Sequence, residues 1–211
     1  MPTRVLIVDD HTIVREGLKQ ILDESANITV AGEAASGQDA LTRLREESYD
    51  VVLLDISLED RSGLDILKQI KGYWPKLPVL ILTMHREDEY AIRSLRAGAA
   101  GYLTKKSAPT ELVAAIEKVA SGGKYVSASL AERLAFAVEP GRVGALHEAL
   151  TDREFQVFSL IVAGNRITEI ANQLCLSVKT VSSHRAHILE KMKMRTVTEL
   201  IRYAVENGLA K

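Results

Sequence analysis

The first 121 residues alternate five short apolar runs with five amphipathic stretches, and this alternation restricts the possible folds more than any other feature of the chain. The apolar runs are typical of buried strands and lie at residues 5–8, 28–31, 51–54, 79–82 and 102–103. The stretches between them have the apolar spacing of helices and lie near residues 11–22, 37–47, 62–73, 87–96 and 109–121. A strand-helix unit repeated five times predicts an α/β fold, a parallel sheet with helices on both faces.

The rest of the chain follows a different pattern. Gly122 and Gly123 interrupt the alternation, and no strand-like run appears after Leu150. Four helical segments follow instead, near residues 152–163, 167–174, 178–193 and 197–207. We therefore expect an α/β domain over residues 1–121, a partly helical linker over 122–146, and a small all-α domain of four helices over 147–211.

Composition excludes several classes of protein. With 46% hydrophobic and 26% charged residues, the chain is neither disordered nor fibrous. No apolar run reaches the roughly 18 residues of a membrane span, and the N-terminus lacks a signal-peptide pattern, so we expect a cytoplasmic protein without membrane contact. The only cysteine, Cys175, excludes an internal disulfide and a thiolate metal site, and we interpret it as a small core residue.

Polar side chains stand where the predicted strands end. Asp9 and Asp10 follow the first strand, Asp55 the third and Thr83 the fourth, and Lys105 lies just past the fifth. In an open parallel sheet, ligands bind beyond the carboxyl ends of the strands where the chain order reverses, which for five strands is between the first and the third. We expect three carboxylates, a hydroxyl and an ammonium group at this one edge.

Three neighbouring carboxylates repel each other unless a cation keeps them ionised. Because no histidine or cysteine ligand is expected at these strand ends, oxygen coordination favours Mg²⁺. A carboxylate can also be the nucleophile in phosphoryl transfer, where Mg²⁺ and a lysine neutralise the charge of the transferred group. A single aspartate at a strand end commonly caps a helix or a turn, but the whole set in this order indicates phosphate chemistry.

The segments LIVDDH, VVLLDISL, LILTMH and GYLTKKS resemble the receiver domains of two-component response regulators, over residues 4–121. The resemblance implies a flavodoxin-like (βα)5 fold with the sheet order 2-1-3-4-5. It also implies that Asp55 accepts phosphate from the phosphohistidine of a sensor histidine kinase. Asp10, with Asp9 and Asp55, would then bind Mg²⁺ together with the carbonyl group of Ser57.

The same resemblance implies a conformational switch. Lys105 would hold one phosphoryl oxygen, and Thr83 would move to donate a hydrogen bond to another. Tyr102 would turn inward into the space that Thr83 vacates, which couples the chemistry to the surface formed by the fifth strand and its flanking helices.

Ser57 and His85 lie where their side chains can flank the phosphoryl group and set its lifetime. For His85, the alternative interpretation is a solvated loop residue. The chain departs from the usual receiver pattern at Glu59, followed by Asp60, because receivers commonly carry proline at the first of these positions. Three interpretations stay open: a more flexible loop, a changed affinity for Mg²⁺, or a pair of carboxylates that faces solvent.

The segment between Leu174 and Val181 places a tight break between two helices, and Ser177 is positioned to cap the second, as in a helix-turn-helix motif. We expect a buried side on these helices formed by Ile170, Ala171, Leu174, Val178, Val181, Ile188 and Met192. The opposite side would meet DNA, with Lys179, Thr180, Arg185 and Lys191 at phosphates and Ser182, Ser183 and Ala186 at base edges.

The segment LTDREFQVFSLIVAGNRITEIANQLCLSVKTVSSHRAHILEKM resembles the LuxR-like helix-turn-helix domain, and its union with a receiver is similar to the NarL/FixJ subfamily. This resemblance implies binding to double-stranded promoter DNA as a homodimer, to which the last helix contributes. It also implies that the receiver shields the recognition helix until phosphorylation, and that RNA polymerase is a further partner.

The sequence therefore predicts a transcription regulator that is switched by phosphorylation of Asp55 and is no enzyme beyond its own phosphorylation and dephosphorylation. A second hypothesis is a DNA-binding regulator that works without phosphorylation and uses the receiver as a scaffold. A third is a free-standing aspartyl-phosphate phosphatase, but the sequence offers no substrate cavity beyond the acidic edge.

Overall fold

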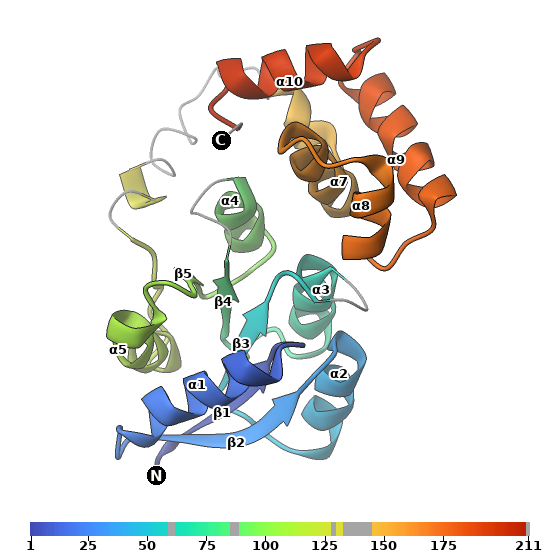
Figure 1. Ribbon diagram of the computed structural model, residues 1–211. Helices are drawn as coiled ribbons and strands as arrows, with labels where there is room; N and C mark the ends of the chain where they lie inside the picture. The colour runs from blue at the N-terminus through green and yellow to red at the C-terminus, as the bar shows by residue number, and fades with distance from the viewer. Residues whose placement is uncertain (59–61, 85–88, 128–129, 133–144, 210–211) are drawn as a thin grey trace. The chain divides into compact units, whose positions relative to one another are not determined.

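The computed structural model describes residues 1–58, 62–84, 89–127, 130–132 and 145–209 (Figure 1). The chain divides into two compact units, Met1–Val138 and Glu139–Lys211. No helix in the described part of the chain is both long and apolar enough to span a membrane.

The first unit contains one parallel sheet of five strands in the order β2-β1-β3-β4-β5, which confirms the predicted flavodoxin-like topology. The strands are β1 (Thr3–Val8), β2 (Ile28–Ala34), β3 (Val51–Asp55), β4 (Val79–Thr83) and β5 (Gly101–Thr104). Since β1 lies between β2 and β3, the chain order reverses at the β1–β3 pair. The residues of β3 and β4 are all buried, in agreement with their uninterrupted apolar sequences.

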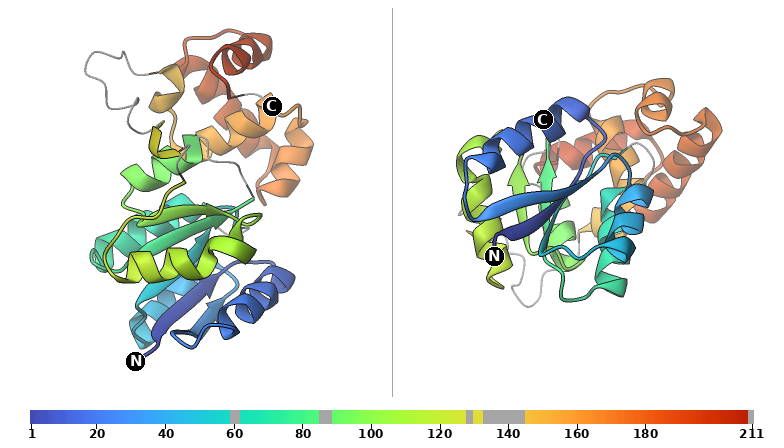
Figure 2. Two further views of the ribbon diagram at one scale, coloured as in Figure 1. Left: turned by 90° about the vertical axis from the view of Figure 1, so that its left-hand side faces the viewer. Right: turned by 90° about the horizontal axis from the view of Figure 1, so that it is seen from below.

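Helices cover both faces of this sheet (Figure 2). They are α1 (Thr12–Asp23), α2 (Gly37–Glu46), α3 (Gly63–Tyr73), α4 (Glu89–Arg96) and α5 (Ala108–Ala120). Helix α1 packs against α5, whereas α2 contacts α3 and α3 contacts α4. The side with α1 and α5 encloses a core to which Leu18, Leu22, Leu112 and Ile116 contribute.

The segment after α5 protects the outer edge of β5. The Tyr102 N–H donates to the Tyr125 carbonyl oxygen at 3.0 Å, and the Tyr125 N–H donates to the Ala100 carbonyl oxygen at 3.0 Å. Only glycine fits at Gly101, because a Cβ atom there would lie 2.5 Å from the Tyr125 carbonyl oxygen. The Tyr125 hydroxyl also donates to Glu111 of α5 at 2.7 Å. The described chain just beyond α5 is therefore a fixed part of the first unit.

The second unit is all-helical in its described part, as expected. A short 3₁₀ helix, η1 (Leu146–Ala149), precedes α7 (Asp152–Val162), α8 (Ile167–Gln173), α9 (Val178–Lys191) and α10 (Val197–Glu206). Capping boxes begin two of the helices, α7 at Thr151 and α10 at Thr196, and these satisfy backbone N–H groups that lack partners within the helix.

Candidate functional site

The carboxyl ends of the strands bring the polar residues of the first unit to one edge. Asp55 and Thr83 are the last residues of β3 and β4, and Asp9 directly follows β1. Lys105 follows β5, where its N–H donates to the Thr83 carbonyl oxygen at 2.7 Å. Gly63 allows the chain after β3 to return to this edge, because its N–H donates to the Ile56 carbonyl and a Cβ atom there would collide with the Asp55 carbonyl.

Lys105 joins two of the carboxylates. Its Nζ lies 2.6 Å from Asp9 Oδ2 and 2.7 Å from Asp55 Oδ2, and it donates a hydrogen bond to Asp55. The two aspartate side chains are each 2% exposed and the lysine side chain is 10% exposed. Two carboxylates at this depth would repel each other strongly, so the ammonium group stabilises the arrangement.

Burial affects the two partners in opposite directions. It raises the pKa of Asp55 above the usual value of a carboxyl group, and this effect outweighs the lowering by Lys105. Burial also lowers the pKa of Lys105, but Asp55 and Asp9 more than compensate, so that the pKa of Lys105 lies above its usual value. Lys105 is therefore a permanent positive charge at neutral pH, placed where it can neutralise an anionic group on Asp55.

Asp10 and His11 complete a cluster of four possible metal ligands. His11 Nδ1 lies 2.5 Å from Asp10 Oδ1, and one ligand atom from each of Asp9, Asp10, His11 and Asp55 lies within 4.8 Å of the others. Our expectation that no histidine ligand lies at these strand ends is wrong, since His11 directly follows Asp10 and is the N-cap residue of α1. Carboxylate oxygens still dominate the cluster, and this donor set fits a hard cation such as Mg²⁺.

The second unit contains a helix-turn-helix motif formed by α8 and α9. The Ser177 side chain accepts a hydrogen bond from the Thr180 N–H at 3.0 Å, which confirms it as the cap of α9. The predicted buried side is present at Ile170, Ala171, Val181, Ile188 and Met192, and Leu174 is half-buried.

Two sequence interpretations fail in this motif. Val178 is 48% exposed instead of buried, because residues 177–180 are all exposed and the first turn of α9 extends past the core. Cys175 is exposed and not a core residue. Its backbone has a φ of 50°, a left-handed conformation that turns the chain between the two helices. Both residues lie on the exposed rim of the turn.

Comparison with known proteins decides the family. Residues 5–117 match the family model of the response regulator receiver domain, and residues 148–204 match that of the bacterial regulatory proteins of the luxR family. The chain belongs to the response regulators. Response regulator UvrY of Escherichia coli K12 is 38% identical over 206 residues, which cover 97% of this chain and 94% of UvrY. Response regulator GacA of Pseudomonas aeruginosa is 35% identical over 207 residues, which cover 98% of this chain and 97% of GacA.

Solved structures of response regulators are similar along the whole chain. RcsB of Salmonella enterica serovar Typhimurium, bound to promoter rprA in the presence of the phosphomimetic BeF3-, has a TM-score of 0.63 and 26% identity, covering 96% of this chain and 98% of its own. A structure of two RcsB dimers bound to two parallel DNAs has a TM-score of 0.60 and 27% identity, and the match covers 97% of this chain and 98% of the RcsB chain. This chain is accordingly a two-component response regulator with a LuxR-type helix-turn-helix DNA-binding domain, and not a conventional enzyme.

Other residues predicted for the receiver edge lie as follows. Ser57 is exposed, and its N–H donates to Asp55 Oδ1 at 3.2 Å, so the backbone after Asp55 holds the carboxylate in place. Thr83 and Tyr102 are completely buried, and Tyr102 therefore has the inward position in this structure. His85, Glu59 and Asp60 lie outside the described residues.

The side of α9 predicted to meet DNA is open to solvent over most of its length. The exposed residues of this set are Lys179, Thr180, Ser183, Arg185 and Ala186, and Ser182 is half-buried. Lys191 differs from the others, because its Nζ lies 2.7 Å from Glu154 Oε2, in a carboxylate that is only 6% exposed. The lysine thus connects the end of α9 to the start of α7 within the response regulator's second unit.

Sequence reasoning missed two charged side chains whose partners lie outside their own helix. Arg15 donates to the Asp9 carbonyl oxygen, and Glu154 pairs with Lys191 from 37 positions away. The spacing of Thr151 and Glu154 gave a signal for the capping box, but none for the ion pair. For Arg15, its place one turn into α1 directly after the acidic pair was the available signal.

Proposed function

We propose that phosphorylation of Asp55 by a sensor histidine kinase controls the binding of this response regulator to promoter DNA. The observation that supports this proposal best is the buried arrangement of Asp55, Lys105 and Asp9, with Lys105 Nζ within 2.7 Å of both carboxylates. A purely structural aspartate has no need of a second buried carboxylate and a shared ammonium group beside it.

The proposed chemistry is a transfer of one phosphoryl group. A carboxylate oxygen of Asp55 attacks the phosphorus of the kinase phosphohistidine, the P–N bond breaks, and the released imidazole takes up a proton. Lys105 neutralises one phosphoryl oxygen. Asp9, Asp10, Asp55 and the Ser57 carbonyl group are the proposed holders of Mg²⁺, which when bound supplies positive charge to the remaining oxygens.

The proposed switch uses Thr83 and Tyr102. Thr83 donates its hydroxyl to the phosphoryl group, and the inward Tyr102 ring fills the space beside it. Because the Tyr102 N–H is hydrogen-bonded to Tyr125, the strand that carries the ring is joined directly to the chain that leads to the second unit. Ser57 and His85 are the proposed determinants of the phosphoryl lifetime.

The proposed DNA surface is the exposed side of α9. Lys179, Thr180 and Arg185 contact phosphates, while base edges are met by Ser182, Ser183 and Ala186. Lys191 is retained in the proposed surface only as a secondary phosphate contact, since its ammonium group is already paired.

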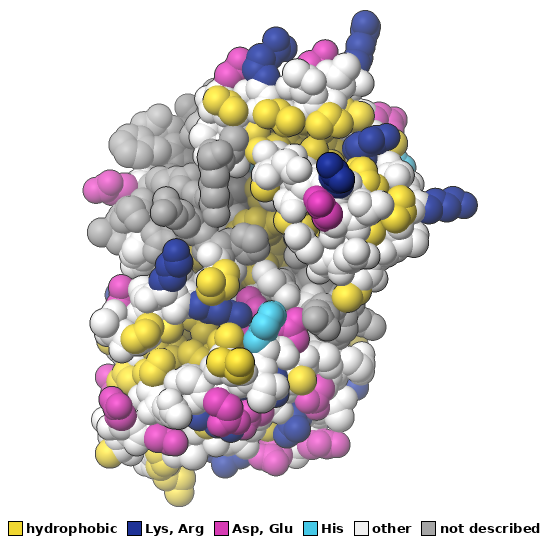
Figure 3. Space-filling model, in the orientation of Figure 1, with side chains coloured by type: hydrophobic (Ala, Val, Ile, Leu, Met, Phe, Trp, Pro, Cys, Tyr) yellow, Lys and Arg dark blue, Asp and Glu magenta, His cyan; other side chains and the backbone are white. Residues whose placement is uncertain are grey.

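A homodimer on paired half-sites is proposed, with α10 as part of the dimer contact. Ile201 and Val205 lie one turn apart on α10 and are 37% and 65% exposed, and hydrophobic side chains gather along this helix in Figure 3. RcsB, a similar protein, binds DNA as dimers.

RNA polymerase is the further proposed partner, and the cytoplasm of a bacterial cell is the proposed location. We propose the domain limits 1–121 for the receiver, 122–146 for the linker and 147–211 for the DNA-binding domain.

The experiment is a fluorescence titration with a promoter library at fixed salt, with and without a small-molecule phosphodonor plus Mg²⁺. Wild type, Asp55→Ala and Asp23→Ala are compared, because Asp23 is an exposed aspartate at the end of α1 and serves as the matched control. Donor-dependent tightening in wild type and Asp23→Ala, lost in Asp55→Ala, supports the proposal.

Equal DNA binding in all samples would instead support the second hypothesis, a regulator whose receiver is only a scaffold. Mass spectrometry of the donor-treated chain shows whether Asp55 is phosphorylated in these samples. A phosphoryl group on Asp55 without any change in DNA binding would mean that phosphorylation controls a property other than DNA binding.

A further inference from the structure

Arg15 connects the body of α1 to the loop that carries the acidic pair. One guanidinium nitrogen, Nη1, donates to the Asp9 carbonyl oxygen at 2.7 Å, and Nη2 donates to Thr12 Oγ1 at 3.2 Å. The side chain is only 14% exposed. Arg15, in the first turn of α1, therefore links this helix to the backbone of the loop between β1 and α1.

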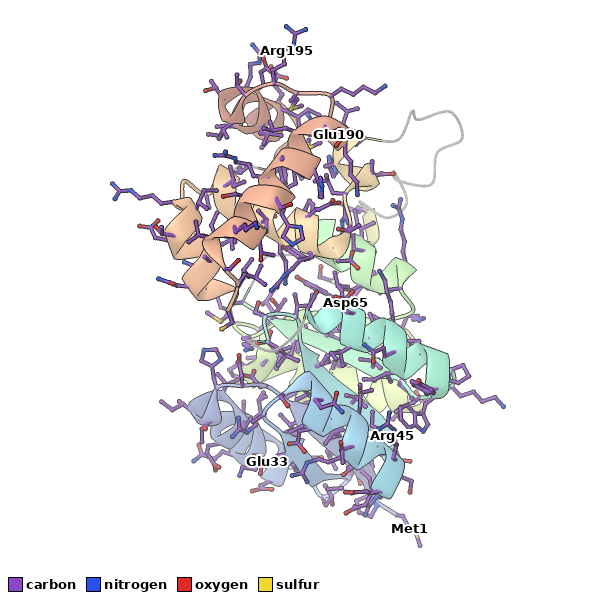
Figure 4. All side chains as sticks on the ribbon, turned by 90° about the vertical axis from the view of Figure 1, so that its right-hand side faces the viewer. Met1, Glu33, Arg45, Asp65, Glu190 and Arg195 are labelled. Atoms are coloured by element: carbon purple, nitrogen blue, oxygen red, sulfur yellow. The ribbon has the colours of Figure 1, made fainter. Side chains whose placement is uncertain are left out.

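Strand β2 holds this guanidinium in place. Arg15 Nε lies 3.4 Å from Glu33 Oε2, and Lys19 Nζ lies 2.8 Å from the other oxygen of Glu33. The hydrogen bond from Lys19 lowers the pKa of Glu33 below the usual carboxyl value, so Glu33 is a permanent anion at neutral pH. Glu33, labelled in Figure 4, thus helps to orient the planar guanidinium group of Arg15.

The described backbone contacts of Asp9 divide between β2 and α1. The Asp9 N–H donates to the Ala34 carbonyl at 3.1 Å, which fixes one side of its backbone to β2. The N-cap residue of α1, His11, provides no side-chain hydrogen bond to the helix, and its own N–H donates to Asp9 Oδ1 at 2.9 Å. The other side of the Asp9 backbone, its carbonyl group, is held by Arg15.

We propose that Arg15 is a positioning residue that keeps the Asp9 and Asp10 carboxylates in the arrangement that binds Mg²⁺. This inference rests on the proposed metal site and names a residue that acts on it through the backbone. Positioning and simple electrostatics predict opposite effects of removing Arg15 on the affinity for Mg²⁺. A positive charge beside a cation site repels the cation, so removal of the charge alone would strengthen Mg²⁺ binding. Loss of positioning would weaken it, because partners that orient metal ligands commonly contribute 10- to 100-fold in affinity.

The test is a titration of the full chain with MgCl2 at constant ionic strength, followed by NMR through the backbone amides of Asp10 and Ser57. Arg15→Met removes both the charge and the fork, and Arg15→Lys keeps the charge alone. Arg43→Met is the control, since Arg43 lies on α2 in an ordinary i,i+4 pair with Asp39 and is 42% exposed. We expect roughly tenfold weaker Mg²⁺ binding in both Arg15 variants and unchanged or slightly tighter binding in Arg43→Met.

Unchanged or tighter binding of Mg²⁺ by Arg15→Met, or wild-type affinity in Arg15→Lys, would overturn the assignment. The thermal unfolding of the first unit, read from the fluorescence of Trp74, distinguishes a merely structural role, in which the melting temperature falls while the Mg²⁺ affinity is retained. If wild type shows no saturable shift at Asp10 and Ser57, the proposed metal site itself fails, and the role of Arg15 fails with it.

Discussion

Lys179 and Lys191 lie on the same helix, and the structure predicts opposite effects of replacing them. Lys191 is paired with Glu154, whose carboxylate is 6% exposed, whereas the lysine itself is 38% exposed. Exposed ion pairs contribute about 0–1 kcal/mol, and removing one partner of a fully buried pair costs about 3–5 kcal/mol. Because solvent screens the lysine but not the carboxylate, we expect Lys191→Met to cost about 1–2 kcal/mol of unfolding free energy, between these two ranges.

The measurement is differential scanning calorimetry of the full chain. For a domain of this size, each kcal/mol corresponds to about 4–8 °C, so the transition of the second unit should fall by roughly 5–15 °C. The first unit provides an internal control, because Trp74 is the only tryptophan of the chain and lies in this unit. The thermal transition followed by tryptophan fluorescence should therefore not move. Lys179→Met should leave both transitions in place, because Lys179 is exposed.

DNA binding gives the opposite result under the proposed function. Lys179→Met should reduce the slope of log K against log salt concentration by about 0.9, the contribution of one phosphate contact. Lys191→Met should change this slope less than Lys179→Met does. The reasoning would be refuted if Lys191→Met left the melting temperature unchanged and reduced the slope by about 0.9, as expected for one phosphate contact. Lys191 would then act mainly as a DNA contact.

Three further changes have expected outcomes. Burial raises the folded pKa of Asp55, so ionisation of this carboxyl group opposes folding, and stability present at low pH is lost as the pH rises through the folded pKa. In urea unfolding without Mg²⁺, we therefore expect Asp55→Asn to be more stable than wild type at pH 7, with a gain that shrinks toward pH 3.8. Gly101→Ala should destabilise the first unit by about 1–3 kcal/mol in urea unfolding followed by Trp74 fluorescence, whereas Gly72→Ala, where a Cβ atom meets nothing within 4 Å, should not. Ser177→Ala should lower the unfolding free energy of the second unit by about 1 kcal/mol, measured by calorimetry, and an unchanged value would mean that the cap of α9 contributes nothing.

The sheet and its functional edge were predictable because both depend on regular patterns. A strand buried on both faces is apolar throughout, as β3 and β4 are, and parallel strands bring their carboxyl ends to one side. The positions of Asp9, Asp55, Thr83 and Lys105 then follow from the topology alone. No knowledge of side-chain conformations is needed for this step.

The errors and omissions have a different physical origin. Helical periodicity assumes that a helix is covered along its whole length, and it therefore placed Val178 in the core, whereas residues 177–180 are exposed in the described structure. Periodicity also carries no information about long polar side chains, whose partners are set by tertiary packing. Arg15 reaches a backbone carbonyl, and Lys191 reaches a carboxylate that already belongs to a capping box.

These two polar contacts share a feature that bears on function. In each, a cation from one helix holds a group at the start of a strand-helix or helix-helix junction, Arg15 at Asp9 and Lys191 at Glu154. The proposed Mg²⁺ ligands Asp9 and Asp10 lie at the junction of β1 and α1, where backbone groups are least restrained by regular hydrogen bonding. Substitution of Arg15 should therefore be measurable chiefly in Mg²⁺ affinity, whereas substitution of Lys191 should be measurable chiefly in the unfolding free energy of the second unit.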